Sequence, residues 1–249
     1  NHLSILGKNK YFNDWFYTNY MFITYWECPP DEHPLYFDSD LYTRCKLTDT
    51  HYYFLNNHDS KIDNMIEFTK AKIDEGVYCI IPLNERYVSS TSAYHQYDFN
   101  HRNFFYGYSD AEKHFYIMTH DKSRHYSEAV LSYEDFNLAF NSMEPLWPMI
   151  TMKMNNEKYS IDWGKIAHDF SRYTNDITFE REGISSVSGI NVSLKLMEVL
   201  QRIKAGKLRK DSRIFATLKE HKQILLCKMK YFIDAGISFN DKNILEKYS

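Results

Sequence analysis

The chain lacks the features that mark several protein classes. It has 4 cysteines in 249 residues, at Cys28, Cys45, Cys79 and Cys227, and no two of them have the spacing of metal ligands. Cysteines so few and so scattered exclude a disulfide scaffold and indicate reduced thiols. No apolar run approaches the length of a membrane span, and the opening NHLSILGKNK is too short and too polar for a signal peptide. We therefore expect a cytoplasmic protein with no membrane partner.

A basic excess, an internal repeat and a low-complexity linker are also missing. The formal net charge is −3, which argues against a nucleic-acid partner. Aromatic residues, in contrast, reach 17%, with 21 Tyr and 17 Phe. Tyrosine combines a flat apolar face with a hydrogen-bonding tip, which suits binding clefts. A genome rich in A and T is the competing explanation for the same bias.

The middle of the chain reads as a mixture of helices and antiparallel strands. Residues 60–75 have helical periodicity, with Ser60 as a plausible N-cap, and the apolar run 77–83 predicts a buried strand. RNFFYGYS and HFYIMTH predict a hairpin joined by DAEK, and SEAVLSY a third strand. A helix then begins after Ser132, with Asp135 three residues on as in a capping box. This order predicts the α+β fold class.

The two ends of the chain are expected to be mainly helical. We expect a buried helix and a short strand within residues 11–26, and helices at 161–175, 189–204 and 214–235. Two prolines in EPLWPMI break the pattern before them. The expected domains are a catalytic core over residues 1–150 and a helical subdomain over 151–249 that packs on it.

His101 and Asp121 stand at the two ends of the expected hairpin. Pairing of the strands would bring them together, so that Asp121 could accept from one ring nitrogen of His101 and leave the other for proton transfer. The plainer interpretation is a solvated histidine and a turn aspartate. His120 is the strongest competitor, and its opposite alternation predicts that it faces away from this site.

The pattern H-x-x-x-x-Y-G-Y-x-x-x-x-K-x-F-Y-I-x-x-x-D over residues 101–121 resembles the His and Asp strands of the papain-like superfamily. It is most similar to the bacteriocin-leader (C39-type) peptidases and the butirosin-type acyltransferases associated with nonribosomal peptide clusters. LSYEDFNLAF, SGINVSLKLMEVLQ and LKEHKQILLCKMKYF add to this resemblance. It implies a papain-like core with an antiparallel sheet packed on helices, and a Cys-His-Asp site using His101 and Asp121.

The resemblance also implies a nucleophilic cysteine at the start of the first helix, where the helix N-terminus lowers a thiol pKa. That position falls just upstream of Asn1, so we expect the nucleophile there. Cys45, beside Arg44 and Lys46, and Cys28, before two prolines, are weaker alternatives. Cys79, within an expected buried strand, and Cys227, on a late helix, are expected to be packing residues.

By this resemblance the protein transfers an acyl or peptidyl group from a carrier-protein thioester to a small amine or diamine. No cofactor or metal is expected, since the carrier delivers its own phosphopantetheine. The alternatives are a cysteine peptidase that cleaves a leader or peptide, and a non-catalytic papain-like binding module. Substrate contacts are expected from five aromatic side chains, Tyr87, Tyr94, Tyr97, Trp15 and Trp26, and the acidic Glu85 and Asp98 are the candidates for contacting the amine. The carrier, typically acidic, is expected to dock on Lys207, Arg209 and Lys210.

Overall fold

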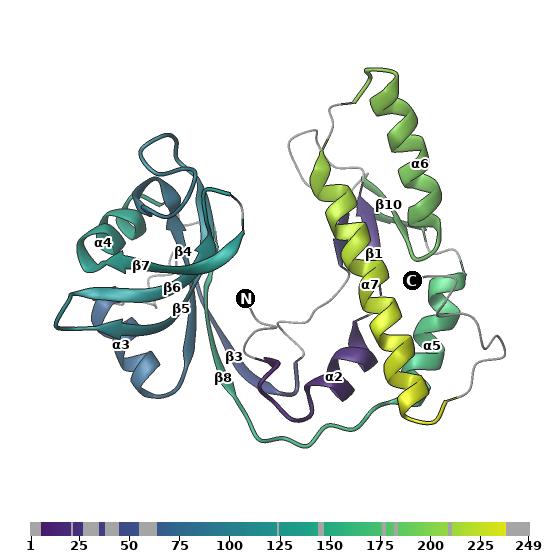
Figure 1. Ribbon diagram of the computed structural model, residues 1–249, viewed down its shortest axis with the longest axis horizontal. Helices are drawn as coiled ribbons and strands as arrows, with labels where there is room; N and C mark the ends of the chain where they lie inside the picture. The colour runs from purple at the N-terminus through teal and green to yellow at the C-terminus, as the bar shows by residue number, and fades with distance from the viewer. Residues whose placement is uncertain are drawn as a thin grey trace. The chain divides into compact units, whose positions relative to one another are not determined.

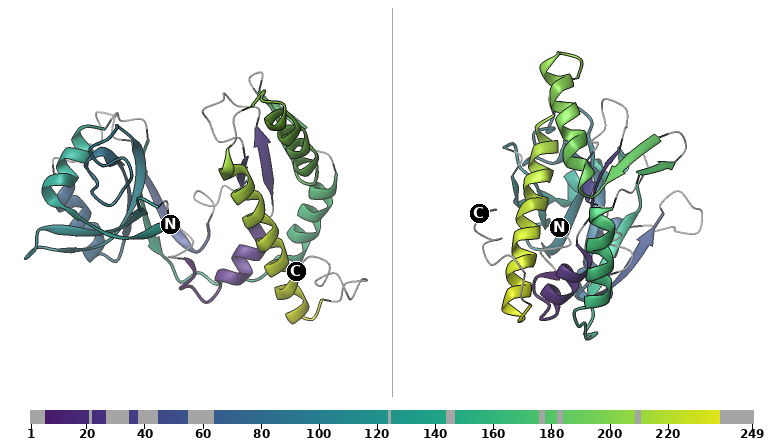
Figure 2. Two further views of the ribbon diagram at one scale, coloured as in Figure 1. Left: turned by 45° about the horizontal axis from the view of Figure 1, so that its top comes forward. Right: turned by 90° about the vertical axis from the view of Figure 1, so that its right-hand side faces the viewer.

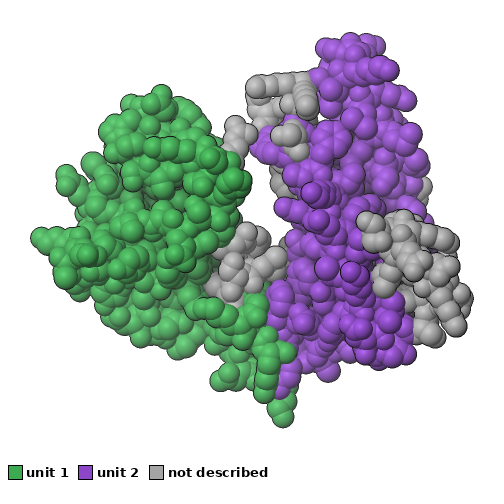
Figure 3. Space-filling model, in the orientation of Figure 1, with its two compact units in different colours: residues 1–10, 42–158 green, residues 11–41, 159–249 purple. Residues whose placement is uncertain are grey.

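The computed structural model describes residues 6–20, 22–26, 35–37, 45–54, 64–123, 125–143, 147–175, 178–181, 184–208 and 211–237. It confirms the α+β class, with helices packed beside two antiparallel sheets (Figure 1). The chain divides into two compact units, residues 1–10 with 42–158 and residues 11–41 with 159–249 (Figure 3). Within the described ranges, the helices fall short of the length and apolar character needed to cross a bilayer.

Unit 1 is built on a six-stranded antiparallel sheet with the order β3-β8-β4-β5-β6-β7. Its strands are β3 (Thr48–Tyr53), β4 (Tyr78–Asn84), β5 (Asn100–Ser109), β6 (His114–His120), β7 (Tyr126–Ser132) and β8 (Met149–Met154). Helices α3 (Met65–Asp74) and α4 (Tyr133–Asn141) and the 3₁₀ turn η1 (Glu85–Tyr87) complete it. The predicted strand at 77–83, the hairpin, the third strand and the helix after Ser132 are all present.

One apolar core fixes α3 and α4 on the same face of this sheet (Figure 1). The ring of Phe105 in β5 meets those of Phe115 and Phe136 edge-on, with ring centroids 5.3 and 5.5 Å from its own. The helix ends follow local rules, since Ser132 and Asp135 form the predicted cap. Helix α3 is capped by Asn64, and Ser60 lies outside the described residues.

Unit 2 contains a sheet that the sequence did not predict. Its order is β2-β1-β10-β9, from β1 (Ile23–Trp26), β2 (Leu35–Phe37), β9 (Thr178–Arg181) and β10 (Ile184–Ser188). The helices are α2 (Phe12–Asn19), α5 (Trp163–Thr174), α6 (Asn191–Lys204) and α7 (Ser212–Asp234), close to the predicted ranges (Figure 2). The units therefore differ from the expected division at residue 150, which cuts through β8, and the second unit is not purely helical. The reason is that β1 pairs with β10, which ties the N-terminal segment to the C-terminal half.

Gly189 joins β10 to α6 at a point where no side chain fits. Its φ is +69°, and a Cβ there would lie 2.5 Å from the backbone oxygen of Tyr173.

We expect Gly189→Ala to lower the free energy of unfolding by about 3 kcal/mol, because the cost of a left-handed conformation and the cost of a backbone clash add together. Denaturant unfolding measures this loss. Gly206→Ala is the matched control in the same unit: its φ is also +69°, nothing lies within 4 Å of its Cβ position, and it should cost only about 1 kcal/mol. Equal losses in the two variants would refute the clash.

Candidate functional site

The candidate site forms where β4 passes into η1 beside the first residues of β5. Leu83 pairs with His101 and Asn84 with Asn100, so the end of β4 and the start of β5 lie side by side. Residues directly opposite each other in an antiparallel pair project to the same face of the sheet. His101 therefore lies next to Glu85, which follows β4 immediately.

Glu85 and His101 form a hydrogen-bonded pair. Oε1 of Glu85 lies 2.8 Å from Nδ1 of His101, and the hydroxyl of Thr119 donates to the same oxygen at 3.5 Å. The Glu85 side chain is 5% exposed, whereas that of His101 is 31% exposed. With the carboxylate ionised, Nδ1 carries the hydrogen and donates to Glu85, which leaves Nε2 as the nitrogen that exchanges a proton with a bound molecule. The buried carboxylate thus fixes both the ring orientation and the tautomer.

Asp121 stabilises a turn in the structure, whereas it was expected to orient His101. Its Oδ1 accepts from the backbone N–H groups of Ser123 and His125, at 2.8 and 2.9 Å, and its own N–H donates to the carbonyl of His125. Aspartate commonly stabilises turns in this way, because its short side chain reaches the backbone two to four residues on. The carboxylate that orients His101 in the structure is Glu85, and the prediction of Asp121 for that role is corrected accordingly.

His120 lies beside His101 rather than facing away from it. The two ring centroids are 5.3 Å apart, so the prediction from strand alternation was wrong. Both residues lie beyond Phe104 and Met118, the last paired positions of β5 with β6, while each stays paired on its other side, His101 with Leu83 of β4 and His120 with Tyr126 of β7. Partial burial first, and then the positive charge that His101 can carry, lower the pKa of His120.

His101 lies within a row of aromatic rings, with neighbours on both sides. Phe99 stacks on His101 with centroids 5.7 Å apart, and Tyr97 meets Phe99 edge-on at 6.4 Å. On the other side, His120 contacts Tyr126 at 5.3 Å. Tyr97 and Phe99 are 51% and 46% exposed, so the row offers open apolar surface next to the histidine. Of these, only Tyr97 was predicted as a substrate contact.

The loop that carries Tyr97 is held by internal hydrogen bonds. The buried Asn84 donates to Oδ1 of Asp98 at 2.8 Å and accepts from the N–H of Phe99 at 3.1 Å. The hydroxyl of the buried Thr91 donates to the backbone carbonyl of Glu85 at 3.1 Å. Asp98, predicted to receive an amine, thus has a positioning contact. The result is that Glu85 is fixed from both its backbone and its side chain.

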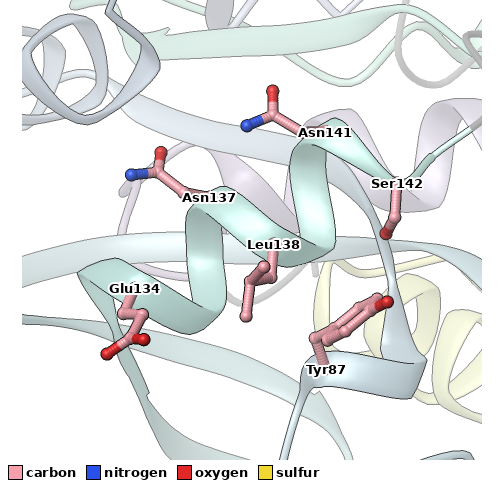
Figure 4. A pocket seen from close by; sticks show the side chains of 6 residues that line it. All are labelled: Tyr87, Glu134, Asn137, Leu138, Asn141 and Ser142. Carbon is pink, nitrogen blue, oxygen red and sulfur yellow. The ribbon is translucent and has the colours of Figure 1, made fainter.

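Tyr87 lines a shallow groove of about 420 Å³ against one side of α4 (Figure 4). Leu138 points toward Tyr87, while Asn137 and Asn141 lie one turn apart along the helix. Glu85 and Tyr87 belong to the same three-residue turn, so one short element holds both the His101 pair and the groove wall. The groove offers amide and carboxylate groups around a small apolar floor.

The remaining predicted residues have varied surroundings. Tyr94 contacts the ring of His95 edge-on at 4.0 Å. Trp15 is 2% exposed within unit 2, so it is a core residue and not a cleft wall, and Trp26 is half-buried at the end of β1. Lys207 is exposed. Cys28, Arg209 and Lys210 lie outside the described residues.

The two described cysteines of unit 1 are not activated thiols. Burial raises the pKa of Cys45, and it raises that of Cys79 to about 12. Neutral thiols are poor nucleophiles, so neither position suits covalent catalysis. Cys227 is exposed on α7 in unit 2, so the prediction that it is a packing residue was wrong.

Among the residues that the structure describes, no three His, Cys, Asp or Glu side chains converge as metal ligands. The arrangement in unit 1 can bind an apolar group along the ring row and can accept a proton at His101. Comparison with models of protein families and with curated proteins finds no match for this chain.

Proposed function

We propose that this protein is an acyltransferase with a papain-like core, in which His101 is the general base and Glu85 is the carboxylate that orients it. The observation that carries the proposal is the 2.8 Å contact between a buried carboxylate and Nδ1 of a partly exposed histidine. A histidine held in this way has one fixed tautomer and one available nitrogen, as a general base requires.

In the proposed reaction, Nε2 of His101 takes the proton of a cysteine thiol, and the thiolate attacks the carbonyl carbon of a carrier-bound thioester. The carrier thiol leaves with a proton from the imidazolium, and an acyl-enzyme thioester remains. An amine then attacks this thioester, His101 accepts the proton of the amine, and the enzyme thiol is restored as the amide departs. The thiol is the nucleophile that the family resemblance implies, and the buried Cys45 and Cys79 do not suit this role.

The surroundings of His101 support transfer to an amine over hydrolysis. Transfer requires that water be kept from the acyl-enzyme. The exposed rings of Tyr97 and Phe99 can cover an acyl chain lying against His101. The donor is a thioester on an acyl or peptidyl carrier protein and the acceptor a small amine or diamine, both in the cytoplasm.

The test is to incubate the full-length protein with an acyl N-acetylcysteamine thioester and a panel of mono- and diamines. We expect amide products by mass spectrometry, and an acyl-enzyme in the intact mass when the amine is omitted. Release of free acid alone, whichever amine is supplied, would identify a hydrolase of the peptidase type. A protein that forms neither an acyl-enzyme nor a product would be a binding module.

A further inference from the structure

Helix α6 is apolar on two sides. Its inner side places the buried residues Val192, Leu196 and Val199 against Ile23 and Tyr25 of β1. Its outer side carries four large apolar residues at helical spacing that remain open to solvent. These are Ile190, Leu194, Met197 and Leu200, which are 50%, 62%, 59% and 46% exposed, and we call them the α6 stripe. Contiguous exposed apolar residues of this kind mark interaction surfaces.

The α6 stripe ends in positive charge. Lys204 lies four residues after Leu200 and seven after Met197, so it continues the same line along the helix. Lys207 is exposed just beyond the end of the helix, and neither Lys204 nor Lys207 has an ion-pair partner among the described residues. The acidic residue of the helix, Glu198, is bound to Lys195 at 3.2 Å. A partner therefore meets an apolar row with unneutralised cations at one end.

We infer that the α6 stripe, with Lys204 and Lys207, is the docking surface for an acidic carrier protein that delivers the donor thioester. This inference rests on the proposed function, and it extends the docking site expected at Lys207 along a whole helix. An apolar row with a charged rim is the usual layout of a transient protein interface. The charge asymmetry requires a partner with carboxylates beside an apolar patch.

A second copy of this chain fits the α6 stripe less well. Parallel packing of two α6 helices would bring Lys204 against Lys204. Antiparallel packing would bring Lys204 against the positive end of the other helix dipole, where the first turn has no acidic residue. Either arrangement gathers like charges, whereas an acidic partner neutralises them.

The test compares two donors that carry the same acyl group, one on an acidic acyl carrier protein and one on N-acetylcysteamine. The variants are Leu194→Ser with Met197→Ser, and Lys204→Glu with Lys207→Glu. We expect each pair to raise KM for the carrier-bound donor at least tenfold and to leave kcat/KM for the small thioester unchanged. Added salt should shrink the effect of the charge pair. Lys230→Glu, at an exposed position on α7, is the control for charge alone and should change neither donor.

Three outcomes would overturn the inference. The first is an equal loss with both donors, which would make the α6 stripe structural. The second is a dimer in light scattering that the Leu194→Ser, Met197→Ser variant converts to monomers. The third comes from a binding assay, fluorescence anisotropy with labelled carrier protein, which applies even if the wild type uses neither donor and the proposed function fails. An unchanged Kd in the variants, or no binding by the wild type, would overturn the inference. A tenfold weaker Kd in the variants would support docking.

Discussion

Alanine in place of His101 is expected to lower the rate of amide formation by about 10²- to 10⁴-fold, the usual contribution of a general base. The loss should appear in kcat at saturating thioester and amine, because the imidazole acts on protons and not on substrate affinity. His101 is 31% exposed at the start of β5, so circular dichroism and the melting temperature should stay near those of the wild type. Near-normal turnover in His101→Ala would remove His101 from the mechanism.

Two carboxylate variants distinguish between the two candidates for the residue that orients His101: Glu85, which contacts it in the structure, and Asp121, which the sequence pattern predicted. Glu85→Gln keeps the shape of the side chain but presents an amide to Nδ1, which permits the wrong tautomer. We expect a fall in kcat of about 10²- to 10⁴-fold, together with a displaced pH–rate profile. Asp121→Asn removes the charge of a turn residue and should leave kcat within about threefold, since its side chain accepts from the backbone N–H groups of Ser123 and His125. The opposite ranking of the two variants would restore Asp121 as the orienting residue.

The elements that were predicted correctly are those with strong local signals. Helix α4 has a capping serine and an aspartate three residues later, and β4 is an apolar run between Gly76 and a polar turn. Strands β2, β3, β8, β9 and β10 were not predicted. The partners of β3, β8 and β10 lie far along the chain, and β9 is an edge strand that pairs only with β10. β8 pairs with β3 from about 100 residues away, and β10 pairs with β1 from about 160.

The candidate site was predicted in part for the same reason. His101 and Glu85 were both predicted as site residues, but Glu85 was predicted to contact the amine substrate and not to orient His101. Their contact depends on the register of β4 with β5, in which Leu83 opposes His101 across a loop of fifteen residues that includes η1. Hydrophobic alternation alone does not set that register. A useful signal was present in LNER: a polar residue and a glutamate directly after a buried strand are costly unless they have partners.

Lys228 of α7 supplies a further large expected effect, this time on stability. Its side chain is fully buried, and its Nζ lies 5.6 and 5.8 Å from the ring centroids of Phe170 and Phe232. Burial lowers the pKa of Lys228 from 10.5 to about 8, and the charge of Asp169, itself paired with Lys165, opposes that shift in part. Below pH 8 the ammonium is charged in both the folded and the unfolded chain, so the full cost of burying it, about 3 kcal/mol, is present.

Between pH 8 and 10.5 the unfolded chain binds more protons at this lysine than the folded one does. The contribution of Lys228 to the free energy of unfolding therefore rises with pH across that window, and its cost disappears near pH 10.5. We expect Lys228→Met to raise the free energy of unfolding by about 1–3 kcal/mol at pH 7, with a gain that shrinks as the pH approaches 10.5. Urea unfolding of both proteins at pH 7 and 10 measures the difference, and Lys230→Met, exposed on the same helix, should change it by less than about 0.5 kcal/mol at either pH. A Lys228→Met protein that is less stable at pH 7, by an amount that does not vary with pH, would show that the buried charge is fully compensated by its surroundings.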